Sequence, residues 1–303
     1  MQATPATSLL EVRGLSKFFR LQGRGWGGSE IHRAVDDVSF DVRPDETLGL
    51  IGESGSGKST IGRLILRLIA ADAGQVKFEG EDILHASRDR LNQLRRRMQI
   101  VMQDPYSALN PRMTIGEFVA EPLVVHGLVR SRSDRREQVA ALFEKVGLPA
   151  DAMDRYPHQF SGGQRQRIAI ARAVALKPKF IVADEPTASL DVSIQAQVLN
   201  LLQDLRAEFG LAMVFISHDF SVVRHMCQRV AVLRYGRIVE LGPSEVLMAT
   251  PLHPYTRRLV AAVPVADPRL ERAREPVPVE TPGEDATPHP LREVSPGHFV
   301  AMP

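Results

Sequence analysis

The chain has 303 residues and a formal net charge of +2, with 44% hydrophobic and 24% charged residues. This length and composition predict a soluble globular protein with one large domain or two ordinary ones. The 38 Lys and Arg are scattered among 36 Asp and Glu, which argues against a surface for nucleic acid.

The cysteine content and the hydropathy pattern narrow the class further. Cys227 is the single cysteine, so we expect neither an internal disulfide nor a cysteine-ligated metal cluster. The opening MQATPATSLL lacks a charged start followed by an apolar core, so no secretory signal is expected. No apolar run approaches the roughly 18–20 residues that span a bilayer. Any role at a membrane would therefore depend on a partner.

The N-terminal third predicts alternating strands and helices. Residues 35–42 alternate between apolar and polar, which is typical of an antiparallel or edge strand. Residues 47–51, TLGLI, form a short continuous apolar run, which is typical of a buried strand. The other elements expected here are a helix at 58–70, a strand within GQVKFEG (74–80), a basic helix near 90–97 and a strand at 99–102.

The middle of the chain differs, because patterned helical segments dominate from about residue 103 to 178. They include IGEFVAEPLVVHGL and SDRREQVAALFEKVGL, the second closed by Gly147 and Pro149. We interpret 103–178 as a helical insertion in an α/β domain made of residues 8–102 and 179–250. The elements expected in the second part are strands at 180–183, 211–216, 229–233 and 237–241 and a helix at 193–209.

Residues 251–303 form a C-terminal extension of different composition. Nine of the 21 prolines lie in the last 40 residues, which contain few aromatic side chains. This composition predicts a tail that is a poor candidate for a compact core and is partly extended or disordered.

GESGSGKS, at 52–59, matches the phosphate-binding pattern G-x-x-x-x-G-K-[ST]. Its glycines let backbone N–H groups face phosphate oxygens, and the helix that follows adds its dipole. Lys58 would reach the β- and γ-phosphates, and the Ser59 hydroxyl would ligate Mg²⁺. Because a predicted strand precedes the pattern and a predicted helix follows it, we favour a nucleotide site over a plain glycine-rich turn.

Polar residues follow three further predicted strands, where ligands of open α/β sheets bind. Asp184 and Glu185 end the strand at 180–183. Asp184 suits an outer-shell contact to Mg²⁺, and Glu185 suits a general base that polarises the attacking water. Gln103 and His218 follow other strands, and His218 could contact a γ-phosphate or Glu185. Alone, the acid pair would more often be a helix cap and the histidine structural, so the phosphate loop decides this interpretation.

A second candidate anion site begins at Ser161, where the sequence SGGQ precedes an apolar helix. The pattern S-x-x-Q is a capping box, and alone it describes a well-capped helix. The functional alternative is an anion site built from backbone amides and the helix dipole. One nucleotide already has its phosphates surrounded by residues 52–59. The second site would therefore serve the nucleotide of another molecule, laid head to tail so that two ATP molecules are sandwiched.

The order of these motifs resembles the ATP-binding cassette (ABC) ATPases over about residues 8–265. The resemblance implies a P-loop NTPase (RecA-like) core of α/β class, an antiparallel β subdomain and an inserted α-helical subdomain. It also implies that ATP is bound through a Walker A segment, a signature and a D-loop. The residues carried over to these three are Gly52, Glu53, Ser54, Gly55, Ser56, Gly57, Lys58, Ser59 and Thr60; Ser161, Gly162, Gly163 and Gln164; and Asp191.

The resemblance also assigns roles to the polar residues at the strand ends. Asp184 and Glu185 resemble Walker B, Gln103 the Q-loop glutamine and His218 the switch histidine. Glu185, His218 and Gln103 are then the expected catalytic residues. The residues expected to hold Mg²⁺ are Ser59, Gln103 and Asp184. Phe19 is expected to stack on adenine; Phe18 is the alternative, and a plain core role stays open for either.

Three longer segments resemble the ATPase subunits of dipeptide and oligopeptide importers, and among these the F-type partner. They are VMQDPYSALNPRMTIGE (101–117), SIQAQVLNLL (193–202) and HPYTRRLVAAVP (253–264). The implied partners are a second ABC ATPase subunit, identical or not, two integral membrane permease subunits and, indirectly, a solute-binding protein, with no nucleic acid. The implied location is peripheral, on the cytoplasmic side of the inner membrane.

Other interpretations and three departures from the family pattern remain. The solute could be nickel or another peptide-like compound, and a soluble ABC ATPase acting on nucleic acid or ribosomes is the more distant alternative. Some relatives carry tail cysteines that resemble an iron–sulfur site; this tail has none, so no cluster is expected. PDE (44–46) stands where the family usually has Pro-Gly-Glu, and Asp tolerates that turn geometry. TASLD exchanges Ala and Ser relative to the usual pattern before Asp191.

Overall fold

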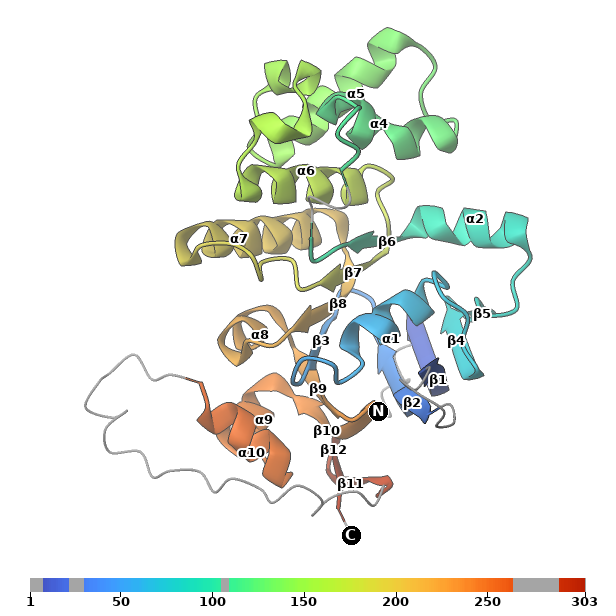
Figure 1. Cartoon of the computed structure of the whole chain (residues 1–303), viewed down its shortest axis with the longest axis vertical. Helices are drawn as coiled ribbons and strands as arrows, with labels where there is room; N and C mark the ends of the chain where they lie inside the picture. Colours follow the sequence, from blue (N-terminus) through green and yellow to red (C-terminus); the bar gives the residue numbers. More distant parts are fainter. Residues whose placement is uncertain (1–7, 22–29, 105–108, 264–288, 303) are drawn as a thin grey trace, which may run out of the picture.

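The computed structural model describes residues 8–21, 30–104, 109–263 and 289–302. Within these ranges the strands form two sheets, one of order β2-β1-β4-β5 and one of order β11-β12-β10-β9-β3-β8-β7-β6 (Figure 1). The strands are β1 (Leu10–Leu21), β2 (Glu30–Val42), β3 (Thr47–Ile51), β4 (Ala73–Phe78), β5 (Glu81–Asp82), β6 (Met98–Val101), β7 (Phe180–Asp184), β8 (Ala212–Ser217), β9 (Arg229–Arg234), β10 (Arg237–Pro243), β11 (Leu291–Ser295) and β12 (His298–Ala301).

The centre of the larger sheet is parallel, since β3 pairs with β8 and β9, and β7 pairs with β6 and β8. Its side chains alternate between two apolar clusters: Ile181 and Ala183 belong to one, and Phe180 and Val182 to the other. Both faces of the sheet are therefore covered, which explains the continuous apolar sequences of these strands. Parallel strands also end at one edge, so the polar residues that follow β3, β6, β7 and β8 are brought together there.

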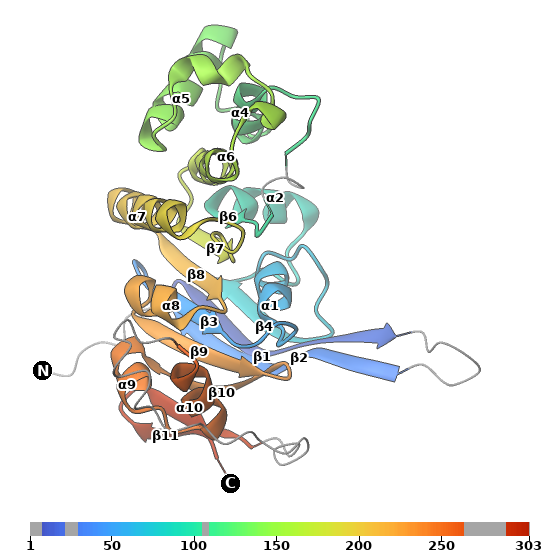
Figure 2. The same cartoon turned by 60° about the vertical axis from the view of Figure 1, so that its left-hand side comes forward.

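The helices cover this sheet and extend beyond it. They are α1 (Lys58–Ile65), α2 (Arg88–Arg97), α4 (Ile115–Val125), α5 (Arg132–Lys145), α6 (Gly162–Val174), α7 (Val192–Phe209), α8 (Phe220–Met226), α9 (Ser244–Ala249) and α10 (Pro254–Ala261), with the 3₁₀ segments η1 (Ala150–Asp154) and η2 (Pro157–Gln159). β6 and β7 pair directly although α4, α5 and α6 lie between them in sequence. The chain thus leaves the sheet, forms these helices at the far end from the C-terminus (Figure 2) and returns beside the strand it left.

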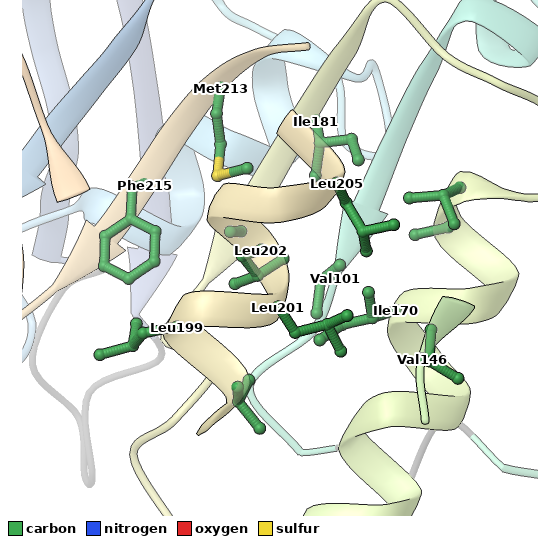
Figure 3. Close-up of a cluster of buried hydrophobic side chains, with 14 of the residues drawn as sticks. Val101, Val146, Ile170, Ile181, Leu199, Leu201, Leu202, Leu205, Met213 and Phe215 are labelled. Carbon is green, nitrogen blue, oxygen red and sulfur yellow. The ribbon is translucent and has the colours of Figure 1, made fainter. Parts of the chain in front are cut away.

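One apolar cluster joins the inserted helices to the sheet. Figure 3 shows its centre, where α7 lies against side chains of the strands and of α6. The residues drawn there include Leu199, Leu202 and Leu205 of α7, Ile181 of β7, Met213 and Phe215 of β8, and Ile170 of α6. Because the same cluster continues to Phe118 and Phe143, the inserted helices share their core with the larger sheet.

The predicted α/β class is confirmed, and most predicted elements occur within a residue or two of their expected bounds. The helix expected at 58–70 ends earlier, at Ile65. Arg67 has a positive φ of 48°, Leu68 N donates to Arg63 O and Arg67 N donates to Leu64 O. These bonds form a left-handed helix end of the kind that usually carries glycine, so periodicity alone did not predict it. Asp45 also has a positive φ, 57°, as the turn at PDE requires.

The C-terminal extension is more ordered than its composition predicts. α9 and α10 follow β10, and β12 pairs with both β10 and β11. His298, Val300 and Ala301 are buried. The prediction of a poor candidate for a compact core is therefore wrong for β12, which pairs with β10 and has three of its four residues buried. The remainder of that prediction falls on residues 264–288, which lie outside the described residues.

Candidate functional site

The phosphate loop connects β3 to α1, as its sequence predicts. Gly57 precedes α1 with a positive φ of 106°, and a Cβ at this position would lie 2.2 Å from the carbonyl oxygen of Ala34. Only glycine fits there. No side chain caps α1, which leaves its first amides oriented for an external anion.

Lys58 lies beneath the loop with 4% of its surface exposed. Its Nζ donates to the carbonyl oxygens of Gly52 at 2.8 Å and Glu53 at 2.9 Å. Burial lowers the pKa of Lys58, while the nearby carboxylates of Glu185 and Asp184 act in the opposite direction. The buried ammonium is thus held by two backbone carbonyls.

Ser59 and Asp184 bring α1 and β7 together. The Ser59 hydroxyl donates to Asp184 Oδ1 at 2.7 Å. Asp184 is 5% exposed, and burial raises the pKa of its carboxyl, opposed in part by the Ser59 hydrogen bond. Within the described residues no group of three or more His, Cys, Asp or Glu side chains could hold a metal on its own. A hydroxyl beside one acid instead fits Mg²⁺, which takes few protein ligands and shares the phosphate oxygens of a substrate.

Two predicted residues, Gln103 and His218, approach the carboxylate of Glu185. Glu185 has a positive φ of 44°, and its N–H donates to the carbonyl oxygen of Ile216 on β8 at 3.0 Å. Gln103 Nε2 donates to Glu185 Oε2 at 2.8 Å, and His218 Nδ1 lies 3.4 Å from the same oxygen. The ends of β6, β7 and β8 thus orient one carboxylate, as the sequence suggested.

Most of these side chains line one cavity of about 610 Å³. The residues that line it are Phe19, His32, Ala34, Ser54, Gly55, Gly57, Lys58, Ser59, Thr60, Gln103, Glu185 and His218. Phe19 is 40% exposed and faces His32 in the β1–β2 register. Phe18 does not line the cavity; its ring lies under the guanidinium of Arg33, 5.5 Å away.

His32 is a lining residue that the sequence reasoning missed. His32 reaches the cavity because it pairs with Phe19 across β1 and β2. The pairing of these two strands is irregular, so the sequence pattern does not reveal which residues lie opposite each other. Tyr255 was missed as well: its hydroxyl accepts a hydrogen bond from the N–H of Glu53 at 3.1 Å.

The signature residues lie away from this cavity. Ser161 caps α6: Gln164 N donates to Ser161 Oγ at 3.4 Å and Ser161 N donates to Gln164 Oε1 at 3.0 Å, which is the predicted capping box. Ser161, Gly162 and Gln164 are exposed, and none of the four residues lines the cavity. Asp191 precedes α7, is exposed and is also absent from the lining. Figures 1 and 2 both show α6 apart from α1.

A phosphate loop, a buried acid beside it, a carboxylate oriented by glutamine and histidine, and an outward-facing capped glycine helix together define an ATPase of the ATP-binding cassette class. Residues 35–188 match the family described as ABC transporter, and residues 239–289 match the oligopeptide/dipeptide transporter, C-terminal region. The chain belongs to the ABC transporter family, as its ATP-hydrolysing component.

Individual relatives agree with this assignment. The chain is 49% identical to the oligopeptide transport ATP-binding protein OppF of Bacillus subtilis, covering 96% of this chain and 95% of OppF. It is 51% identical to the glutathione import ATP-binding protein GsiA of Escherichia coli, covering 90% of this chain and 45% of GsiA. Among solved structures it resembles the dimeric post-hydrolysis state of the ATP-binding cassette MJ0796 bound to ADP and Pi, with a TM-score of 0.70, 30% identity and coverage of 78% and 98%.

The helices in the described ranges include none that is both long and apolar enough to cross a membrane.

Proposed function

We propose that this chain is the ATP-hydrolysing subunit of an importer for peptides, and that it works as a head-to-tail dimer with two ATP molecules between the subunits. The observation that carries the dimer is the separation of Ser161 and Asp191 from the cavity that holds Lys58 and Glu185. In one chain the two candidate anion sites cannot meet the same phosphate. A second subunit resolves this by placing its α6 over the cavity, and the MJ0796 cassette was solved as a dimer.

The chemistry follows from the side chains around the cavity. Lys58 would bind the β- and γ-phosphates, with the amides at the start of α1 as further donors. Ser59 and Gln103 would hold Mg²⁺, with Asp184 in its outer shell, and the ion would supply positive charge to the phosphate oxygens. Glu185 would accept a proton from the attacking water. His218 would contact the γ-phosphate, and Phe19 would stack on adenine.

A groove of about 400 Å³ supports a permease partner. It lies where the end of α1, β6, α4 and α6 meet, and its lining includes Leu68, Met102 and Phe118. Leu68 and Met102 are 45% and 44% exposed. The occupant we propose is a helix of an integral membrane permease subunit, because Met102 directly precedes Gln103, which contacts Glu185. Movement of such a helix against Met102 would shift Gln103 and, through it, the carboxylate of Glu185.

Peptides are the solute class that the comparisons favour. The C-terminal match is to a region of oligopeptide and dipeptide transporters, and OppF carries oligopeptide transport in its name. We therefore propose a peripheral location on the cytoplasmic side of the inner membrane, beside two permease subunits and, indirectly, a solute-binding protein. Isolation of the chain with RNA and without a membrane partner would contradict this function.

The test of the mechanism is Glu185→Gln. This variant should lose roughly 10²–10⁴-fold in turnover, because a general base contributes that much. It should still dimerise with Mg-ATP, measured by light scattering, since the bound nucleotide is no longer cleaved. The matched control is Glu245→Gln, which changes an exposed acid on α9 and should hydrolyse ATP normally. A Glu185→Gln chain that stays monomeric at saturating Mg-ATP would refute either the sandwich or the assignment of the base.

A further inference from the structure

The C-terminal extension touches the phosphate loop through one side chain. Tyr255, on α10, is 2% exposed. Its hydroxyl accepts the hydrogen bond from Glu53 N at 3.1 Å, although the two residues are 202 positions apart in sequence. The guanidinium groups of Arg234 and Arg258 lie over the ring, 5.1 and 5.7 Å from its centroid. Burial raises the pKa of Tyr255, so the hydroxyl keeps its proton at neutral pH.

This contact clamps the peptide group at the start of the loop. The Glu53 N–H belongs to the peptide group that joins Gly52 to Glu53, and Tyr255 accepts its hydrogen bond. The Gly52 carbonyl of the same peptide group accepts from Lys58 Nζ at 2.8 Å. Lys58 would release Gly52 on turning to phosphate oxygens, so one of the two contacts to this peptide group would be lost on binding. The Tyr255 contact does not depend on Lys58 and can keep the loop in shape.

A buried carboxylate fixes the helix that carries Tyr255. Glu240, on β10, has no exposed surface. It accepts hydrogen bonds from the backbone of Leu252 at 2.9 Å and of His253 at 3.0 Å, just before α10. Its Oε1 also lies 2.8 Å from Nε2 of His298, a 3% exposed residue on β12. The His253 side chain then caps α10 by accepting from Tyr255 N at 3.1 Å.

We propose that Tyr255 is a positioning residue for nucleotide binding, and that the C-terminal strands control it through the Glu240–His298 pair. This inference rests on the assignment of residues 52–59 as the nucleotide site. The C-terminal extension is then part of the ATPase, because its last strand fixes the geometry of the loop that binds phosphate. A molecule that binds the C-terminal extension would therefore change the affinity for ATP.

The first experiment is Tyr255→Phe in the full chain, with affinity for Mg-AMP-PNP measured by calorimetry and ATP hydrolysis measured by steady-state kinetics. Phe keeps the ring and its contacts with the two guanidinium groups and removes only the hydroxyl. We expect affinity to fall, and KM for ATP to rise, roughly three- to tenfold with little change in kcat, because one hydrogen bond to the loop is lost. Tyr235→Phe is the matched control. Its ring also contacts Arg234 and is 75% exposed, so affinity should not change.

The outcomes separate this inference from the proposed function. If the unmodified chain fails to bind Mg-AMP-PNP, the assignment of the nucleotide site is wrong. If it binds and Tyr255→Phe binds equally well, only the role of Tyr255 is overturned. A lower Tm for Tyr255→Phe with unchanged KM would mean that the hydroxyl is merely structural, which also overturns the proposal.

A second pair of variants tests the link to β12. His298→Leu removes the donor to Glu240, whereas His298→Gln can replace it with an amide N–H. We expect His298→Leu to raise KM for ATP in the same direction as Tyr255→Phe, and His298→Gln to restore it. Circular dichroism identifies any variant that fails to fold. If the folded Leu and Gln variants share the KM of the unmodified chain, the C-terminal strands do not control the loop.

Discussion

The charge of Asp184 would serve the proposed Mg²⁺ site, and its burial lowers the stability of the fold without nucleotide. Its carboxylate is almost fully buried at the end of β7, and burial raises its pKa. A carboxyl whose folded pKa lies above its unfolded value binds a proton more readily when folded. Its contribution to stability therefore falls as pH rises from the unfolded pKa through the folded pKa. At neutral pH the ionised form costs stability that Mg²⁺ would offset.

This gives a prediction for Asp184→Asn. In the absence of nucleotide and Mg²⁺, the variant should have a higher Tm than the unmodified chain at pH 7, because Asn carries no charge and can still accept from Ser59. The difference should shrink as the pH falls through the raised pKa of Asp184, because Asp184 then loses its own charge. Mg-dependent hydrolysis should be lost. Calorimetry over this pH range checks the effect, with Asp204→Asn, an exposed change on α7, as the control. A lower Tm for Asp184→Asn at pH 7 would show that the buried charge is net favourable.

At the scale of elements, the junction of α6 and α7 sets the direction of the signature. A Cβ on Gly163 would lie 2.4 Å from Cγ2 of Ile194, so the Ile194 side chain of α7 packs directly on the backbone of α6. Ile194 in turn packs on the apolar cluster that includes Phe215. The position of Ser161 is thus fixed by a contact between the backbone of one helix and a side chain of the next.

Gly163→Ala should therefore displace the start of α6 and lower ATP hydrolysis, since overpacking of this kind typically costs about 1–3 kcal/mol. Binding of Mg-AMP-PNP to a single chain should persist, because the phosphate loop is remote. The double variant Gly163→Ala/Ile194→Ala removes the obstructing methyl and should recover hydrolysis. The measurements are nucleotide affinity and turnover for all three proteins. Equal turnover in the single and double variants would mean that the contact is irrelevant.

The helices and strands show which features of the fold could be predicted from sequence and which could not. Short apolar runs such as TLGLI predicted buried strands, because parallel strands covered on both faces need apolar residues throughout. The capping box at Ser161 predicted the start of α6 for an equally local reason. The early end of α1 at Arg67 and the positive φ of Glu185 were not predictable, since both depend on distant hydrogen bonds. The contact between Glu53 and Tyr255 was hidden for the same reason.

At the scale of the whole molecule, the proposed dimer would complete each ATPase site with residues of both subunits. Lys58 and Glu185 line one cavity, whereas Ser161 is exposed on the inserted helices. A head-to-tail pair would give each cavity the Ser161 of the other chain. Substitutions of Lys58 and Glu185 in one chain would then affect the same ATP site. Substitutions of Lys58 and Ser161 in one chain would affect the two different ATP sites of the dimer.

Mixing of two inactive variants tests this arrangement. Lys58→Ala and Ser161→Arg should each lack hydrolysis alone. In a mixed pair, the intact loop of the Ser161→Arg chain meets the intact signature of the Lys58→Ala chain, so one working site forms and activity returns. A mixture of Lys58→Ala with Glu185→Gln is the matched control: either site of the mixed pair then contains one defect, so no activity should return. Phosphate release after incubation with Mg-ATP measures both mixtures. Recovery in both mixtures, or in neither, would contradict a head-to-tail pair of identical chains.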